Sequence, residues 1–366
     1  MTEFDKTETI VQGITPSVPL TESIDSESST KTKAPTLLLE EIACEKPAIR
    51  RPSTEKEIKA YVLQTLPKIK ERFRGEYHSM MAVYYNLDQH TYVFTGVDKD
   101  GAHQAIKVWT PAPWFTNLEH TIKQQRFYDE IDLISGMYQL MRGKNVVKVT
   151  GIGAKTRKGD RPIVYFTTNY VERILSNIHP AAFPLKKLVG VHKQVAGFLS
   201  FVHRNYGIIH KDVKPGNILI NNDDEAFLID FGSMEGMNIE NRMSEIGTIP
   251  YLSPAQAEGM LNIDAGKTAL ALDYSTDMYS LGTTLADIIF KNHPQNKLAA
   301  QADFYKDRND PDGFCRRLVW GPEITFPSTK NNALDEFIYR SRTQTDDKYE
   351  SMEEAENALS DIEANL

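Results

Sequence analysis

The residues best suited to chemistry lie in a polar loop between two short apolar runs. Asp212, Lys214 and Asn217 follow an apolar run that begins at residue 207, and they precede a second run at 218–220. Thirteen residues after Asn217, Asp230 follows a third apolar run at 226–229. Two carboxylates and a carboxamide at neighbouring strand ends form an oxygen-rich site that suits Mg²⁺. Lys214 adds a cation for a phosphate, and Asp212 adds a base that can hold a hydroxyl.

These strings resemble the motifs of the eukaryotic-type protein kinase family. Its catalytic loop reads H-R-D-x-K-P-x-N and its magnesium loop reads D-F-G. Here the loops are 210–217 and 230–232, and Asp212 and Asp230 are 18 residues apart. The resemblance implies that Asp212 orients the substrate hydroxyl and accepts its proton, and that Lys214 neutralises the γ-phosphate of ATP. It also implies that Asn217 and Asp230 bind Mg²⁺.

The family has a lysine on an upstream strand, and Lys107 lies in the apolar run 104–108. A lysine in such a run is costly unless it is paired. Glu130 lies three residues after Phe127 and four before Ile134, and therefore on their inward-facing stripe. Glu119 lies on a similar face and is the alternative partner. By resemblance, Lys107 holds the α- and β-phosphates of ATP and Glu130 holds Lys107.

Three further segments resemble parts of the same family. Residues 247–254 resemble its peptide-positioning loop, and Thr248 together with Lys214 is the serine/threonine pattern. Residues 277–282 resemble the buried helix whose aspartate, here Asp277, braces the catalytic loop. Residues 168–171 fall where the family has its hinge, so the backbone groups of Asn169 and Val171 are expected to bind adenine. The resemblance covers residues 76–355.

The loop that should cover the phosphates departs from the family. The three glycine positions of G-x-G-x-x-G-x-V, aligned on Val93, are Asn86, Asp88 and Thr91. Asn and Asp tolerate left-handed turn conformations, so a hairpin can still form. At ~5 Å, Asp88 would repel the triphosphate by about 1–3 kcal/mol for an effective dielectric of 20–80. The loop therefore predicts weakened ATP binding.

The second half of the chain also departs from the family. Ala255 stands where the family has a glutamate, and Lys348 stands at its arginine partner, so both members of a buried ion pair are replaced together. Lys211 replaces an arginine of the catalytic loop and keeps its charge. Ser244 lies four residues before Thr248, and its phosphorylation, with Lys211 as the receiving cation, is one hypothesis for regulation. A serine without such a role is the alternative.

The elements that must position these residues form two groups. Helical spacing extends over 53–74, and strands are expected at 81–85, 91–97, 103–109, 146–152 and 162–168, with a helix at 115–141. After residue 169 helices dominate, interrupted by short strands at 207–213, 218–221 and 226–231. His203 lies one residue beyond an apolar helical stripe and is interpreted as a packing residue. The fold class is α+β, a two-lobed protein-kinase-like fold with an N-terminal antiparallel five-stranded sheet, one main helix and a mostly helical C-terminal lobe.

The domain organisation follows from composition and from this pattern. Residues 1–54 hold 15 Ser or Thr, 5 Pro and one aromatic residue, which predicts a disordered tail. The kinase domain is expected at 55–366, with its N-lobe at 76–168, its hinge at 169–173 and its C-lobe at 174–366. No run of about 20 apolar residues is present, as a membrane span would require. The presence of only two cysteines favours a reducing compartment, taken as the cytoplasm with secretion into a host cell left open. A net charge of −8 argues against a nucleic-acid binder.

Three functions remain to be weighed. The preferred hypothesis is a serine/threonine protein kinase that uses ATP and Mg²⁺ to phosphorylate a protein substrate, because each polar catalytic position carries a usable side chain. The alternative is a pseudokinase that acts as a binding or scaffolding module, which the glycine-free phosphate loop favours. A small-molecule phosphotransferase of kinase-like fold is the third hypothesis, and the peptide-positioning segment argues against it.

Overall fold

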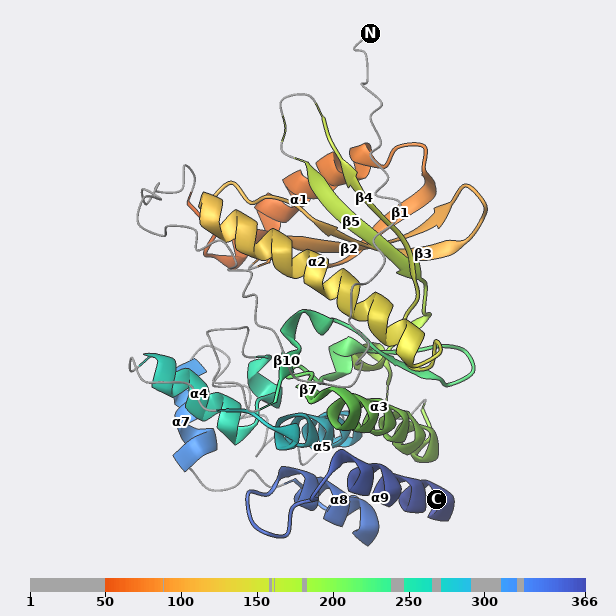
Figure 1. Ribbon diagram of the computed structural model, residues 1–366, viewed down its shortest axis with the longest axis vertical. Helices are drawn as coiled ribbons and strands as arrows, with labels where there is room; N and C mark the ends of the chain where they lie inside the picture. The colour runs from red at the N-terminus through yellow and green to blue at the C-terminus, as the bar shows by residue number, and fades with distance from the viewer. Residues whose placement is uncertain are drawn as a thin grey trace, which may run out of the picture. The chain divides into compact units, whose positions relative to one another are not determined.

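The computed structural model describes residues 50–366 except 88, 158–159, 161, 180–182, 238–246, 265–270, 291–310 and 321–325 (Figure 1). The chain divides into two compact units. Unit 1 comprises residues up to Gly136 together with Lys148–Tyr170, and unit 2 comprises Met137–Val147 and Val171–Leu366. Within the described ranges, no helix is long and apolar enough to cross a membrane.

A five-stranded antiparallel sheet forms the centre of unit 1, as the sequence predicts. The strand order is β1-β2-β3-β5-β4. The bounds are Tyr77–Asn86 for β1, Thr91–Asp98 for β2, His103–Trp109 for β3, Val149–Lys155 for β4 and Ile163–Asn169 for β5. β4 begins three residues later than expected because the preceding apolar residues belong to unit 2, where Val146 forms a bridge with Leu228.

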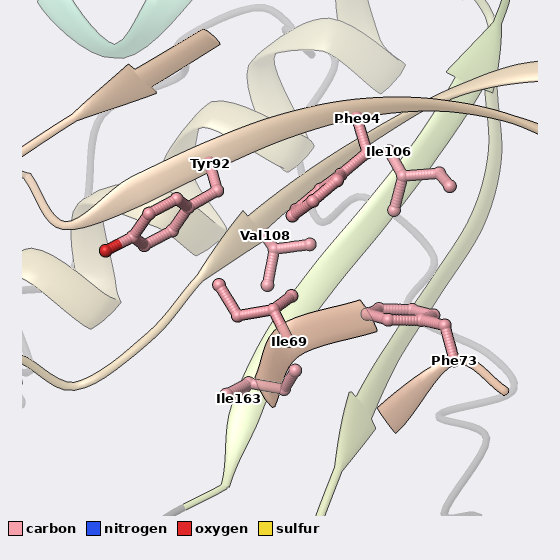
Figure 2. Packing of buried hydrophobic residues seen from close by; sticks show 7 residues of the cluster. All are labelled: Ile69, Phe73, Tyr92, Phe94, Ile106, Val108 and Ile163. Carbon is pink, nitrogen blue, oxygen red and sulfur yellow. The ribbon is translucent and has the colours of Figure 1, made fainter. Parts of the chain in front are cut away.

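One face of this sheet is covered by α1 (Glu55–Arg72). The helix begins with a capping box, in which Thr54 accepts from the Glu57 N–H and the Glu57 carboxylate accepts from the Thr54 N–H. At its other end, Ile69 and Phe73 pack against the sheet, as Figure 2 shows. The sheet residues of this cluster are Tyr92, Phe94, Ile106, Val108 and Ile163. The C-terminal end of α1 therefore forms an apolar interface with the sheet.

The other face of the sheet meets α2 (Asn117–Leu140). Successive side chains of a strand point to opposite faces, so Lys107 points away from the α1 side on which Ile106 and Val108 are buried. Phe166, the register partner of Lys107 on β5, lies 5.3 Å from the ring of Phe127 on α2. Unit 1 is thus a sheet between two helices, with Lys107 on the α2 side.

The central helix of unit 2 is α3 (Leu185–Tyr206), and it leads directly into the catalytic-loop segment. It ends at Gly207, whose φ of 60° is left-handed. The short strands that follow are β7 (Ile208–Ile209), β8 (Ile218–Ile220), β9 (Ala226–Leu228) and β10 (Glu235–Gly236); β6 (Arg173–Ile174) precedes α3. β7 and β9 end earlier than expected because Lys211 and Asp230 adopt left-handed φ values of 69° and 67°, which interrupt an extended strand.

The remaining described α-helices of unit 2 are α4 (Pro254–Asp264), α5 (Tyr274–Phe290), α7 (Pro311–Trp320), α8 (Asn332–Arg342) and α9 (Met352–Asn365). Of these, α5 and α9 pack against α3, while α8 packs on α5 and α9, and α4 packs on α7. α9 lies along α3, where a side chain at Gly190 or Gly197 would come within 3 Å of Glu363 or Glu356. The carboxylate ends of Glu363 and Glu356 on α9 thus lie over Gly190 and Gly197 on one face of α3.

Candidate active site

The backbone of the catalytic loop is held by one buried carboxylate on α5. Asp277 accepts the N–H of His210 at 2.7 Å and the N–H of Lys211 at 2.8 Å. His203 donates to the same carboxylate from α3, at 2.8 Å. Burial alone would raise the pKa of Asp277, but these hydrogen bonds and the nearby histidines together lower it. His203 is buried, but it is more than the packing residue that we expected, because it is part of this brace.

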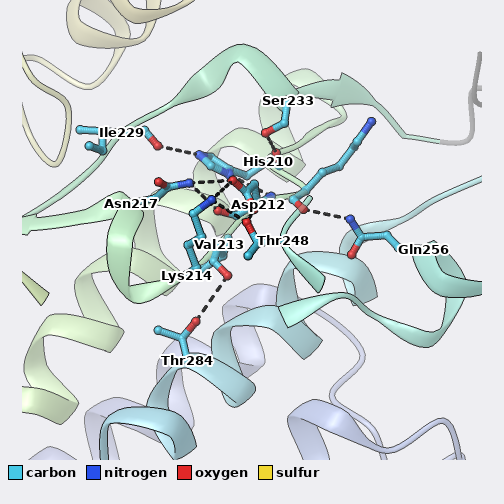
Figure 3. Close-up of polar contacts among 11 residues, drawn as sticks. His210, Asp212, Val213, Lys214, Asn217, Ile229, Ser233, Thr248, Gln256 and Thr284 are labelled. Atoms are coloured by element: carbon cyan, nitrogen blue, oxygen red, sulfur yellow. Dashed lines mark hydrogen bonds and ion pairs between the residues drawn. The ribbon is translucent and has the colours of Figure 1, made fainter. Parts of the chain in front are cut away.

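Three side chains converge on the carboxylate of Asp212 (Figure 3). The Thr248 hydroxyl donates to Oδ1 at 2.7 Å, and the Lys214 ammonium lies 2.5 Å from Oδ2. The Asn217 amide donates to Oδ2 at 3.0 Å and to the Asp212 carbonyl at 2.9 Å. Lys214 also donates to the Thr248 hydroxyl, at 2.6 Å. The structure therefore brings together Asp212, Lys214 and Asn217, as the sequence predicts, and adds Thr248 to them.

The segment that carries Thr248 is anchored on the catalytic loop by Gln256. Its side-chain amide donates to the Lys211 carbonyl at 2.9 Å and accepts the Ser253 N–H at 3.0 Å. Gly247 has a φ of +91°, and a Cβ there would lie 2.6 Å from the Lys211 carbonyl oxygen. Only glycine fits this position. These contacts bring the peptide-positioning segment directly against the catalytic loop within unit 2.

Asn217 and Asp230 flank the paired strands β8 and β9. The Ile229 N–H donates to the Asn217 carbonyl at 3.0 Å, so Asp230 directly follows a residue that is bonded to Asn217. Because the Asn217 NH₂ group is directed to Asp212, its Oδ1 is the atom that it offers to a cation. A carboxylate and an amide oxygen at adjacent strand ends fit Mg²⁺, which takes few protein ligands and keeps waters and phosphates.

The residues after Asp230 are fixed by aromatic packing within unit 2. Phe231 is fully buried, stacks on Phe198 at 5.9 Å and meets the His210 ring edge to face at 5.7 Å. Ser233 donates to the His210 carbonyl at 2.7 Å. Burial lowers the pKa of His210, and the carboxylates of Asp277, Asp212 and Asp230 oppose this shift only in part. His210 is therefore a neutral packing group that joins the two loops.

In unit 1, Lys107 and Glu130 form an ion pair. The Lys107 ammonium lies 2.6 Å and 2.8 Å from the two carboxylate oxygens of Glu130, and both side chains are mostly buried. Glu119, the alternative partner, instead accepts the N–H and the hydroxyl of Thr116 and so caps the start of α2. Of the two glutamates that the sequence placed on a similar face of this helix, Glu130 is therefore the one that meets Lys107.

The hairpin that should cover the phosphates joins β1 to β2. Asn86 pairs with Thr91, and the Asn86 side chain accepts the Gln89 N–H at 3.1 Å. The described part of this loop is therefore a closed turn without glycine, as expected from the sequence. Asp88 lies outside the described residues.

His90 anchors this hairpin to α1. Its Nδ1–H donates to the Thr110 carbonyl at 2.7 Å, and its Nε2 accepts from the Tyr61 hydroxyl at 2.8 Å. The Trp114 ring lies 5.2 Å from the His90 ring. Burial lowers the pKa of His90 to about 4, so it is neutral at pH 7. Tyr61 of α1, a helix that precedes the sheet in the chain, thus holds the end of the β1–β2 hairpin.

The two expected adenine-binding residues lie at the division between the units. Asn169 is the last residue of β5, and its N–H donates to the Lys148 carbonyl at 3.1 Å while its side chain accepts the Lys148 N–H. The backbone N–H of Asn169 is therefore already used, which leaves its carbonyl as the group to be considered for adenine. Val171 is the first buried residue of unit 2 after the division.

A family model described as a protein kinase domain matches residues 90–357. The chain belongs to the protein kinase family. The kinase is 33% identical to a probable serine/threonine-protein kinase of Clostridium perfringens over 181 residues, 48% of this chain and 23% of the relative. It is 33% identical to serine/threonine-protein kinase PknB of Mycobacterium tuberculosis over 141 residues, 36% of this chain and 21% of PknB. These matches thus cover less than a quarter of each relative.

The match leaves α1 and β1 of this kinase outside the family model, although both are part of unit 1. Sequence reasoning missed the roles of three residues around the catalytic loop, namely His203, Gln256 and Glu235, whose carboxylate lies 2.5 Å from the Lys211 ammonium. The spacing of Ser253 and Gln256 is that of a capping box, and this was the signal that could have found Gln256. Ser244 lies outside the described residues.

Proposed function

We propose that this chain is a serine/threonine protein kinase, which transfers the γ-phosphoryl group of ATP to a hydroxyl of a protein substrate. The observation that carries the proposal is the cluster at Asp212, where a hydroxyl, an ammonium and an amide lie within 3.0 Å of one carboxylate. The relatives that are named serine/threonine-protein kinases support the same choice.

In this proposal Asp212 acts as the base. It accepts the proton of the substrate hydroxyl while that oxygen bonds to the γ-phosphorus and the bond to the β–γ bridging oxygen breaks, which releases ADP. The Thr248 hydroxyl supports this role, because it already donates to Asp212 at 2.7 Å. Lys214, 2.5 Å from the same carboxylate, neutralises the γ-phosphate.

Four side chains and the hinge backbone would hold the nucleotide. Asn217 and Asp230 would bind Mg²⁺, which neutralises phosphate charge when it is bound. Lys107, oriented by Glu130, would hold the α- and β-phosphates. The backbone groups of the hinge residues, the Asn169 carbonyl and Val171, would bind adenine.

The test is phosphoryl transfer from labelled ATP-Mg²⁺ to a basic protein. We expect Asp212→Asn to lower turnover by about 10²–10⁴-fold and to retain nucleotide binding, because loss of a general base removes a contribution of that size. Asp230→Asn should also lose Mg²⁺-dependent nucleotide binding. Asp223→Asn, an exposed turn residue, is the matched control and should behave as wild type. Wild-type turnover in Asp212→Asn would refute the assignment of this loop.

A pseudokinase is the second candidate, and the glycine-free hairpin between Asn86 and Thr91 favours it. It would bind a nucleotide or a partner without transferring phosphate. The same assay distinguishes the kinase from the pseudokinase. Mg²⁺-dependent nucleotide binding by the wild type, without any transfer to the basic protein or to the chain itself, would favour the pseudokinase.

A further inference from the structure

Lys211 places a buried positive charge directly before Asp212. Its side chain is 0% exposed, and its ammonium lies 2.5 Å from Oε2 of Glu235. A buried ammonium is costly unless a carboxylate balances it, and removal of one member of such a pair leaves an uncompensated charge. Glu235 is therefore one of the contacts that hold the Lys211 side chain in place.

The position of Glu235 is set by a short strand pairing. It lies on β10, where it pairs with Ile209 of β7, the strand that leads into the catalytic loop. The next residues continue this contact, because the Met237 N–H donates to the Gly207 carbonyl. The carboxylate is thus held beside the catalytic loop by the backbone that follows the 230–232 segment.

Lys211 transmits this position to its neighbour. Its φ is 69°, in the left-handed region that favours glycine. Its N–H donates to Asp277 and its carbonyl accepts from Gln256. Hydrogen bonds therefore hold the Lys211 backbone on both sides, and the ion pair with Glu235 holds the end of its side chain. A rotation of this peptide would move the Asp212 carboxylate that follows it.

We propose that Glu235 is a positioning residue that supplies, within the chain, the anion that fixes Lys211, so that phosphoryl transfer requires no phosphate on this protein. The inference rests on the proposed function and concerns how that kinase activity is regulated. The structure gives Lys211 a carboxylate partner, in place of the phosphoserine partner considered from the sequence. A phosphate brought to Lys211 would meet Glu235, and the two anions would repel each other.

The first experiment compares the full chain before and after phosphatase treatment, with mass spectrometry to establish the phosphate-free form. We expect the same initial rate within about twofold and a progress curve without a lag. A loss of more than about tenfold on dephosphorylation, or a lag during which the chain becomes phosphorylated, would overturn the inference. Absence of transfer in both forms would instead contradict the proposed function itself.

The second experiment uses Glu235→Gln, with Glu225→Gln at an exposed turn residue as the matched control. We expect Glu235→Gln to lower kcat about 10–100-fold with the KM for ATP within about twofold, because Lys211 directly precedes Asp212, the proposed base, whereas Lys107 and Glu130 are the residues proposed to hold the nucleotide. A general loss of structure would instead alter both constants. Unchanged kcat in Glu235→Gln would refute the positioning role.

A double variant keeps the inference testable if the single variant folds poorly. Lys211→Met removes the charge that Glu235 balances. The effects of two residues that act through one contact are not additive. We therefore expect Lys211→Met with Glu235→Gln to lose no more activity than Lys211→Met alone. Additive losses would show that the two residues act independently and would refute the proposal.

Discussion

We expect Ile69→Ala on α1 to destabilise unit 1 by about 2–4 kcal/mol. Ile69 is 3% exposed and packs against the sheet that carries Lys107. The substitution removes three carbon atoms, worth about 0.8 kcal/mol each by transfer, and adds the cost of a cavity. Leu63→Ala removes the same number of carbons from the same helix, but Leu63 is 62% exposed. Its effect should therefore stay within about 0.5 kcal/mol.

The assay is urea unfolding followed by tryptophan fluorescence. Trp109 and Trp114 are buried in unit 1, whereas Trp320 in unit 2 is 69% exposed and can be replaced by phenylalanine. In that background the signal reports unit 1 alone. The midpoint for Ile69→Ala should fall by about 1–2 M urea for a typical slope. A loss below about 1 kcal/mol, or an equal loss in Leu63→Ala, would refute the role of α1 as the cover of the sheet.

Two further outcomes follow from the buried histidines. His90 and His192 each have a pKa lowered by burial from 6.5 to about 4, so the unfolded chain binds protons that the folded chain does not. Each histidine should lower the free energy of unfolding by about 3 kcal/mol as the pH falls from 6.5 to 4. In urea titrations across this pH range, His192→Gln should remove the part of the pH dependence that His192 contributes. Tyr61→Phe should cost about 0.5–1.5 kcal/mol, because the buried Nε2 of His90 loses its 2.8 Å donor. An unchanged midpoint in Tyr61→Phe would contradict the anchoring of the hairpin by α1.

Elements with a clear period were predictable from the sequence. The runs 91–97 and 103–109, separated by turn residues, identified β2 and β3. The stripe that contains Phe127 and Ile134 left Glu130 and Glu119 as candidate partners of Lys107, and the family resemblance favoured Glu130. Each of these signals extends over several residues, so one unusual residue does not obscure it. The motif residues Asp212, Lys214 and Asn217 came together because they lie in one short loop between two strands, so their side chains cannot lie far apart.

Features that depend on contacts distant in the sequence were not predictable in the same way. β10 has two residues, which is too short for any period, so neither the strand nor the pair between Glu235 and Lys211 had a sequence signal. His203 lies one position beyond an apolar stripe, and its role depends on Asp277, which is 74 residues away. Lys211 and Asp230 ended strands early because their backbone is left-handed, and the contacts that hold the Lys211 backbone come from the distant residues Asp277 and Gln256.

Because α9 packs along α3, the scaffold of the catalytic loop stays incomplete until residues 352–365 have been synthesised. Lys193 on α3 pairs with Glu363, which is 170 residues later in the chain. Unit 1 is complete much earlier, at Tyr170, yet the chain already contains the segment Met137–Val147, whose apolar residues are buried only when unit 2 has formed. At 5–20 residues per second, the ribosome needs roughly 10–40 s to add the intervening ~200 residues. The nascent chain therefore presents this segment to chaperones or to other chains for that interval.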